Sequence, residues 1–190
     1  KDAASFEKKE IIESNFFLPI DRIFHKQGFG TIVTGTLRHG NLDNKSEVIL
    51  LPQEEKLSIR SIHVNNKEVP QAEKGQRVAI NLRGIKISNL NRGNVVSSQN
   101  FLKKTIAFEA KIKILERPSC RLKNNSIVHV LVGTLDVSAR IKISKKNILS
   151  QGEEALVKFF FNTPVVTHEH EKFVIRSFSP SKTIGGGEIT

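Results

Sequence analysis

Few segments of this sequence resemble a reactive or ligand-binding motif, and the first is rich in glycine. Residues 30–36, Gly-Thr-Ile-Val-Thr-Gly-Thr, have the glycine spacing of a phosphate-binding loop. Such a loop needs a lysine and must open a helix whose N-terminal amides bind the anion. The lysine is missing, and β-branched residues alternate along the segment. We therefore expect a strand here, and for Gly185-Gly186-Gly187 we expect a close approach between strands.

Metal and nucleophile chemistry is also weakly supported. His168-Glu169-His170 could supply two metal ligands, but the sequence nominates no third one, so a solvated turn is the favoured interpretation. Cys120 is the single cysteine, has no base beside it and cannot form an internal disulfide. The histidines and serines show no triad order. We predict no metal site and no catalytic residue in this chain.

The elements that would position functional residues are strands. From Phe17 onward the apolar residues recur with a period of two, which is typical of half-buried strands. In segment 77–83, Val78, Ile80 and Leu82 share one face. In segment 106–114, Ile106, Phe108, Ala110, Ile112 and Ile114 should face inward, and segment 135–143 repeats the pattern.

Short turn clusters separate these runs at hairpin spacing, for example at 39–41, 65–67 and 123–125. In segment 57–64 the apolar positions change face, which predicts a β-bulge near Arg60-Ser61. Without helical crossovers the strands must be antiparallel. We predict an all-β chain of two consecutive antiparallel β-barrels, at residues 16–99 and 100–190, after a linker or tail of a preceding domain at residues 1–15.

Composition narrows the class of protein. Apolar residues make up 38% of the chain, and no run approaches the roughly 20 apolar residues that span a bilayer, so we expect a soluble, cytoplasmic protein without membrane contact. The 30 Lys and Arg against 19 Asp and Glu give a formal charge of +11, which favours an anionic partner. The alternative is a generically basic, well-solvated surface. Since Met is absent even at position 1, we expect the chain to lie within a longer reading frame.

Four ordered motifs resemble the second domain of translational GTPases such as elongation factor Tu. They are residues 17–24 (Phe-Leu-Pro-Ile-Asp-Arg-Ile-Phe), 28–36, 73–85 and 91–96. Three further features are most similar to the selenocysteine-specific elongation factor family. They are Asp21-Arg22, Gly75-Gln76-Arg77 and, in the second half, residues 129–134, 139–140 and 176–187. The likeness covers residues 16–190 and identifies the two barrels as resembling domains two and three of elongation factor Tu.

This resemblance implies a parent protein that carries selenocysteinyl-tRNA to the ribosome in a GTP-dependent manner. The chain would be its tRNA-binding middle fragment, a monomer that binds rather than catalyses. GTP and Mg would be held by an upstream domain, and the mRNA hairpin would be read only through downstream domains. The alternative is the equivalent pair of barrels from another translational GTPase, either elongation factor Tu-like or a factor that carries initiator tRNA; an unrelated enzyme or scaffold is a more distant possibility.

The resemblance also implies an aminoacyl pocket at Asp21, Arg22 and Arg77. A selenol is more acidic than a thiol and is largely anionic at neutral pH, so a guanidinium would favour it over the neutral hydroxyl of serine. Asp21 would either accept a hydrogen bond from the aminoacyl α-amino group or orient an arginine. The alternative is that Asp21 and Arg22 form an ordinary surface ion pair and that Arg77 merely alternates outward on its strand.

For the second barrel the resemblance implies contacts with the tRNA backbone. The matching positions are Gly133, Thr134, Ser138, Arg140, Arg176 and Lys182. Phosphate contacts need only exposed basic or hydroxyl groups, so a solvated face is the alternative for each of them.

Overall fold

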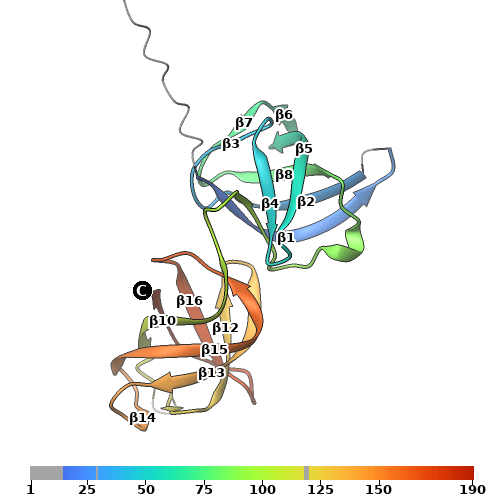
Figure 1. Cartoon of the computed structure of the whole chain (residues 1–190). Coiled ribbons are helices and arrows are strands. Elements are labelled where there is room, and N and C mark those ends of the chain that lie inside the picture. The colour runs from blue at the N-terminus through green and yellow to red at the C-terminus, as the bar shows by residue number, and fades with distance from the viewer. Residues whose placement is uncertain (1–14, 29, 118–119) are drawn as a thin grey trace, which may run out of the picture.

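The computed structural model describes residues 15–28, 30–117 and 120–190, and the predicted linker up to residue 14 lies outside them. The described residues form seventeen β-strands and one short 3-10 helix at Ile87–Asn89. They are arranged as two closed antiparallel barrels. Figure 1 shows the two barrels one above the other, joined by the segment that leads into β10. The predicted all-β, two-barrel fold is confirmed.

The first barrel closes through six strands in the order β4-β9-β1-β2-β8-β5, because β4 also pairs with β5. Strand β6 adds an edge beside β5, and β3 pairs with β7 in a separate small sheet. The bounds of these strands are β1 Phe17–Lys26, β2 Gly30–Thr36, β3 Leu42–Asp43, β4 Glu47–Leu51, β5 Glu55–Val64, β6 Lys67–Val69, β7 Gln71–Ala72, β8 Arg77–Arg83 and β9 Val95–Ser98.

Alternating side chains explain why these segments form a barrel. In β8 the predicted inward residues Val78, Ile80 and Leu82 are all buried in the first core. In β5 the pairing with β8 shifts register between Ile59 and Ser61, which confirms the predicted bulge. The extra residue turns the apolar positions after it back to the interior, so the core is continuous along the strand.

The second barrel closes through six strands in the order β10-β15-β13-β12-β16-β17, with β17 pairing back onto β10. Strands β11 and β14 form a separate pair. The bounds are β10 Lys104–Ile114, β11 Leu122–Lys123, β12 Ile127–Val132, β13 Leu135–Ile143, β14 Ile148–Leu149, β15 Glu154–Val166, β16 Lys172–Ser177 and β17 Thr183–Ile189.

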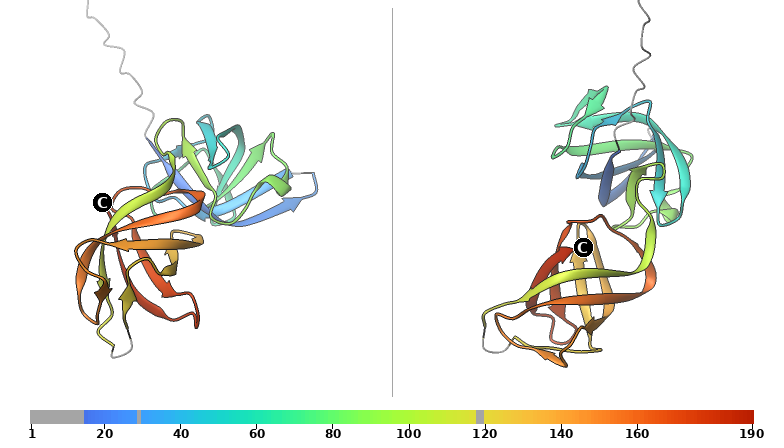
Figure 2. Two further views of the ribbon diagram at one scale, coloured as in Figure 1. Left: turned by 60° about the horizontal axis from the view of Figure 1, so that its bottom comes forward. Right: turned by 60° about the vertical axis from the view of Figure 1, so that its left-hand side comes forward.

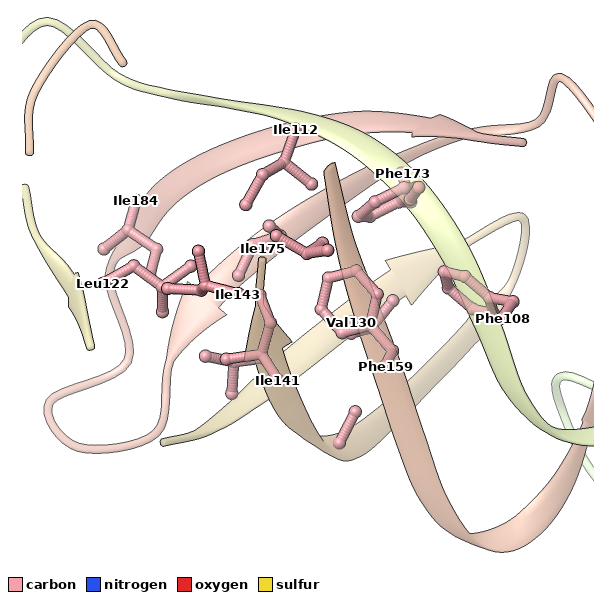
Figure 3. Close-up of a cluster of buried hydrophobic side chains, with 14 of the residues drawn as sticks. Phe108, Ile112, Leu122, Val130, Ile141, Ile143, Phe159, Phe173, Ile175 and Ile184 are labelled. Atoms are coloured by element: carbon pink, nitrogen blue, oxygen red, sulfur yellow. The ribbon is translucent and has the colours of Figure 1, made fainter. Parts of the chain in front are cut away.

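Aromatic rings fill one part of this second core. Phe108, Phe159 and Phe173 come from three different strands and point into the same interior (Figure 3), with ring centroids 5.2–5.7 Å apart. A Cβ on Gly187 would lie 2.2 Å from the carbonyl oxygen of Lys111, so β17 can approach β10 this closely only with glycine. The predicted close strand approach at the three glycines is therefore confirmed.

One predicted inward residue points outward. Ile106 is 63% exposed, whereas Phe108, Ala110, Ile112 and Ile114 are buried as predicted. Thr105 pairs with Val165 but Ala107 pairs with Phe160, so four residues of β15 lie opposite Ile106 alone, and this irregularity breaks the alternation. The prediction for Ile106 was wrong because periodicity alone does not show where the partner strand carries extra residues.

An apolar cluster joins the two barrels. Phe17, Leu51 and Val95 of the first barrel pack with Leu102 of the connecting segment and Val166 of the second barrel. The strands of the first barrel end at Ser98 and those of the second begin at Lys104, and the chain passes between the barrels once (Figure 2). No helix in the described ranges is long and apolar enough to cross a membrane.

Candidate functional site

A β-bulge in β1 brings two consecutive polar residues to one face of the first barrel. Ile20 pairs with Gly35 and Arg22 pairs with Thr34, so Asp21 is the extra residue between them. In a regular strand neighbours point to opposite faces, but a bulge re-aims one of them. Asp21 can therefore stand beside Arg22 near the outward side chain of Thr34. A Cβ on Gly35 would lie 2.2 Å from the carbonyl oxygen of Pro19, so the bulge also needs that glycine.

Asp21 binds Arg77 across three strands of this face. Arg77 donates from Nη1 to Oδ2 at 2.6 Å and from Nη2 to Oδ1 at 3.1 Å. The hydroxyl of Thr34, on β2 between them, donates to the same Oδ1 at 2.7 Å. The Asp21 side chain is 20% exposed and that of Arg77 is 53% exposed, so the carboxylate lies beneath a guanidinium that faces outward. The structure thus brings two of the three predicted pocket residues into direct contact.

The charges of this pair stabilise each other. Partial burial raises the pKa of the Asp21 carboxyl, but hydrogen bonds from Arg77 and Thr34 and the nearby positive charges lower it by more, so the pKa lies below its ordinary value. The hydrogen bond to Asp21 raises the pKa of Arg77. Both groups are therefore charged at neutral pH.

Arg22 is the third predicted pocket residue and lies beside this pair. Its side chain is exposed and pairs with no carboxylate within the described ranges. The positive charge of Arg22 nevertheless helps to lower the pKa of Asp21. The site therefore holds one arginine fixed by a carboxylate and one that is not fixed, which suits recognition of an anion.

Three of the predicted tRNA-contact residues share the outer face of the second barrel. His129 on β12 pairs with Ser138 on β13 and with Arg176 on β16, so these two predicted residues flank it. Arg140, two residues along β13, is exposed and donates from Nη1 to the carbonyl oxygen of Asn125 at 3.2 Å. On this face Arg140 is exposed, whereas Ser138 and Arg176 are half-buried.

Gly133 and Thr134 lie elsewhere, in the turn between β12 and β13 that faces the first barrel. A Cβ on Gly133 would lie 3.4 Å from Pro19. The carbonyl oxygen of Thr134 accepts a hydrogen bond from Nε of Arg92 at 3.2 Å. The structure does not bring these two residues together with Ser138 and Arg176, and instead places them at the junction of the barrels.

Lys182 lies in the loop between β16 and β17. Its backbone N–H donates to the hydroxyl of Ser177 at 3.0 Å, and the Lys182 side chain is exposed. In the same loop Arg176 donates from Nη2 to the carbonyl oxygen of Ser181 at 3.3 Å. Lys182 is thus near Arg176 along the chain, and it lies at the end of the second barrel that is farther from the first barrel.

The two histidines considered as metal ligands have other partners. Nδ1 of His168 is 2.6 Å from the carbonyl oxygen of Glu169, and Nδ1 of His170 is 2.9 Å from the carboxylate of Glu188. Across residues 15–28, 30–117 and 120–190, no three His, Cys, Asp or Glu side chains gather as a metal site would require.

The sequence did not reveal two features of these candidate sites. Thr34 was not singled out, because only the pairing of β1 with β2 shows that it lies opposite Arg22. The other is the stack of His129 on Phe178, with ring centroids 5.4 Å apart and planes 11° apart. Phe178 is 58% exposed, and no spacing rule links the two residues.

Two family models match consecutive parts of the chain. Residues 30–97 match elongation factor Tu domain 2, and residues 109–190 match the β-barrel domain of the selenocysteine-specific elongation factor. These ranges follow the two barrels.

Two curated relatives carry the same name. A selenocysteine-specific elongation factor of Desulfomicrobium baculatum is 30% identical over 92% of this chain and 27% of its own length. One of Methanocaldococcus jannaschii is 32% identical over 97% of this chain and 43% of its own length. The chain therefore spans less than half of the relatives that it matches, and the predicted resemblance is confirmed.

Proposed function

This chain is a member of the selenocysteine-specific elongation factor family, and we propose that it is the tRNA-binding middle part of a factor that delivers selenocysteinyl-tRNA to the ribosome in a GTP-dependent manner. The observation that carries the proposal is the match of residues 109–190 to the β-barrel domain of that factor, directly after a barrel of the elongation factor Tu domain 2 type. The first type of barrel fits other translational GTPases too, so the second match favours this factor over the elongation factor Tu-like alternative.

The pocket at Asp21, Arg22 and Arg77 would receive the selenocysteinyl group. A selenolate is negatively charged, whereas the hydroxyl of serine is neutral at pH 7. Two guanidinium groups on one face would therefore favour selenocysteine through charge. Asp21 keeps one guanidinium in place and offsets part of the total charge.

The outer face of the second barrel would contact the tRNA backbone. Ser138, Arg140 and Arg176 offer hydroxyl and guanidinium groups on neighbouring strands, and Lys182 adds a flexible charge at the end of the barrel. Such groups position a nucleic acid without reading its sequence. Gly133 and Thr134, at the junction of the barrels, would contact the backbone only where the tRNA crosses that junction.

The remaining activities would belong to other parts of the protein. This chain binds and orients, and GTP with Mg is held by a domain outside it. The mRNA hairpin is read by further domains, and the factor works as a monomer in the cytoplasm. The barrels supply the surface along which the tRNA lies.

Binding of tRNA to this chain tests the proposal. We expect binding at low salt that weakens steeply as salt rises, because basic residues release counterions from the phosphates. Arg140→Gln should weaken binding and reduce the salt dependence, whereas Lys67→Gln on the edge strand β6 should change neither. Binding that is absent at low ionic strength, or that does not depend on salt, would contradict the proposal.

Discrimination tests the pocket separately. In the whole protein, Arg22→Ala and Arg77→Ala should each reduce the preference for selenocysteinyl-tRNA over seryl-tRNA. Arg83→Ala, at the opposite end of β8, is the matched control and should leave the preference unchanged. If both pocket variants discriminate as well as the unchanged protein, the pocket lies elsewhere.

A further inference from the structure

We infer that Thr34 is a positioning residue of the aminoacyl pocket: its hydroxyl fixes the carboxylate of Asp21, which in turn fixes the guanidinium of Arg77. The inference rests on the proposed function and deepens it. It also assigns different tasks to the two arginines, because only Arg77 is held in this way. Arg22 is the one left to adjust to the ligand.

The hydrogen bonds of Asp21 decide between its two possible roles. Oδ1 accepts from Thr34 at 2.7 Å and from Arg77 at 3.1 Å, and Oδ2 accepts from Arg77 at 2.6 Å. A two-point contact between arginine and carboxylate fixes the plane of the guanidinium. A carboxylate has about four acceptor sites, and these bonds fill three of them, so at most one site, on Oδ2, is left for an α-amino group. We therefore assign Asp21 mainly to orienting an arginine.

Thr34 is well placed to keep the carboxylate still. It lies on β2, which is paired on one side with β1 and on the other with β8, so its backbone is held by both neighbours. As a β-branched residue it has few side-chain rotamers. Its partner across the ladder on β8 is Ala79, whose methyl group offers no competing hydrogen bond. The hydroxyl is therefore directed to Asp21.

The arrangement leaves donors for a ligand. A guanidinium has five N–H groups, and Asp21 takes one from each terminal nitrogen of Arg77. Nη2 of Arg77 also lies 3.5 Å from the hydroxyl oxygen of Thr34, and the Arg77 side chain is 53% exposed, so part of the guanidinium is accessible to a ligand. Because its charge is already balanced by Asp21, Arg77 supplies direction, whereas the unpaired charge of Arg22 supplies most of the attraction to an anion.

Three variants of this chain test the inference. Thr34→Val keeps the shape and removes the hydroxyl, Thr34→Ser keeps the hydroxyl, and Thr36→Val removes a neighbouring hydroxyl that does not contact Asp21. Two quantities are measured by nuclear magnetic resonance: the titration midpoint of the Asp21 carboxyl, and the rate at which the Arg77 guanidinium rotates. In Thr34→Val we expect the Asp21 midpoint to rise toward its ordinary value and the rotation to become about threefold faster, as loss of one hydrogen bond implies. In Thr34→Ser and Thr36→Val both should stay unchanged.

A purely structural role for Thr34 would lower stability without moving either quantity, and that result would overturn the inference. The preference for selenocysteinyl-tRNA over seryl-tRNA is then measured in the whole protein with the same variants. A reduced preference in Thr34→Val, restored in Thr34→Ser, supports both the inference and the pocket. If the Asp21 midpoint moves and the preference does not, Thr34 still positions the ion pair, and it is the proposed pocket function that fails.

Discussion

The contact between Gly93 and Leu135 gives the sharpest test of how the two barrels meet. Gly93 has φ +93°, and a Cβ there would lie 2.8 Å from Cδ1 and 3.2 Å from Cα of Leu135 in the second barrel. An L-residue with positive φ costs about 1–2 kcal/mol. Forcing a methyl group into a filled contact costs about 1–3 kcal/mol more. Gly93→Ala should therefore destabilise the chain by about 2–5 kcal/mol.

A matched glycine separates the two contributions. Gly84 has φ +86°, and a Cβ there would meet no atom within 4 Å. Gly84→Ala should therefore lower the free energy of unfolding only by the cost of the positive φ. Unfolding in urea is followed by circular dichroism, since the chain has no Trp or Tyr to report by fluorescence. Adding Leu135→Ala to Gly93→Ala should restore part of the lost stability, because it removes Cδ1 of Leu135, the atom closest to the new methyl group. If Gly93→Ala is as mild as Gly84→Ala, the barrels do not meet at this contact.

Three further predictions concern the junction and the second core. Burial, with the nearby charges of His168 and Lys74, lowers the pKa of His39 below 6.5, so the unfolded chain binds more protons than the folded one. The contribution of His39 to stability should be complete above pH 6.5 and should fall as the pH drops below it. His39→Gln should flatten this pH dependence, as measured by urea midpoints. Phe159→Ala, at a fully buried ring, should cost about 3–5 kcal/mol in urea unfolding, whereas Phe160→Ala, at a ring 39% exposed, should cost far less, and equal losses would contradict the described core. Gly187→Ala should lower the thermal midpoint sharply, because its Cβ would lie 2.2 Å from a backbone oxygen on β10; an unchanged midpoint would mean that β17 lies farther away.

Much of the fold could be predicted from alternation along single segments. The inward faces of β8 and most of β10, and the bulge in β5, follow from local patterns. Ile106 could not be placed, because the bulge that exposes it is defined by what β15 does opposite. The strand order within each barrel could not be deduced either, since it depends on pairs such as Phe17 with Ser97, which are far apart in the sequence.

The candidate site shows the same division. Asp21, Arg22 and Arg77 were singled out by motifs that the sequence displays directly. The contact between Asp21 and Arg77 could not be deduced, because it needs both the bulge in β1 and the order of β1, β2 and β8 in the sheet. Thr34 lies within the motif at residues 28–36 but no role follows from that motif, and only its place between the two partners shows its importance.

The pairing that closes each barrel also sets an order of folding during synthesis. The first barrel needs β9 to pair with β1, so it can close once residue 98 is available. The second needs β17 to pair with β10, which joins Ala110 to Ile189 and must wait for the last strand. Contacts between distant residues form slowly, and domains generally fold as units from the N-terminal side. The surface of the first barrel that includes Phe17 and Val95 therefore lacks its partner Val166 until β15 has been made, and apolar surface that waits for its partner is prone to aggregation.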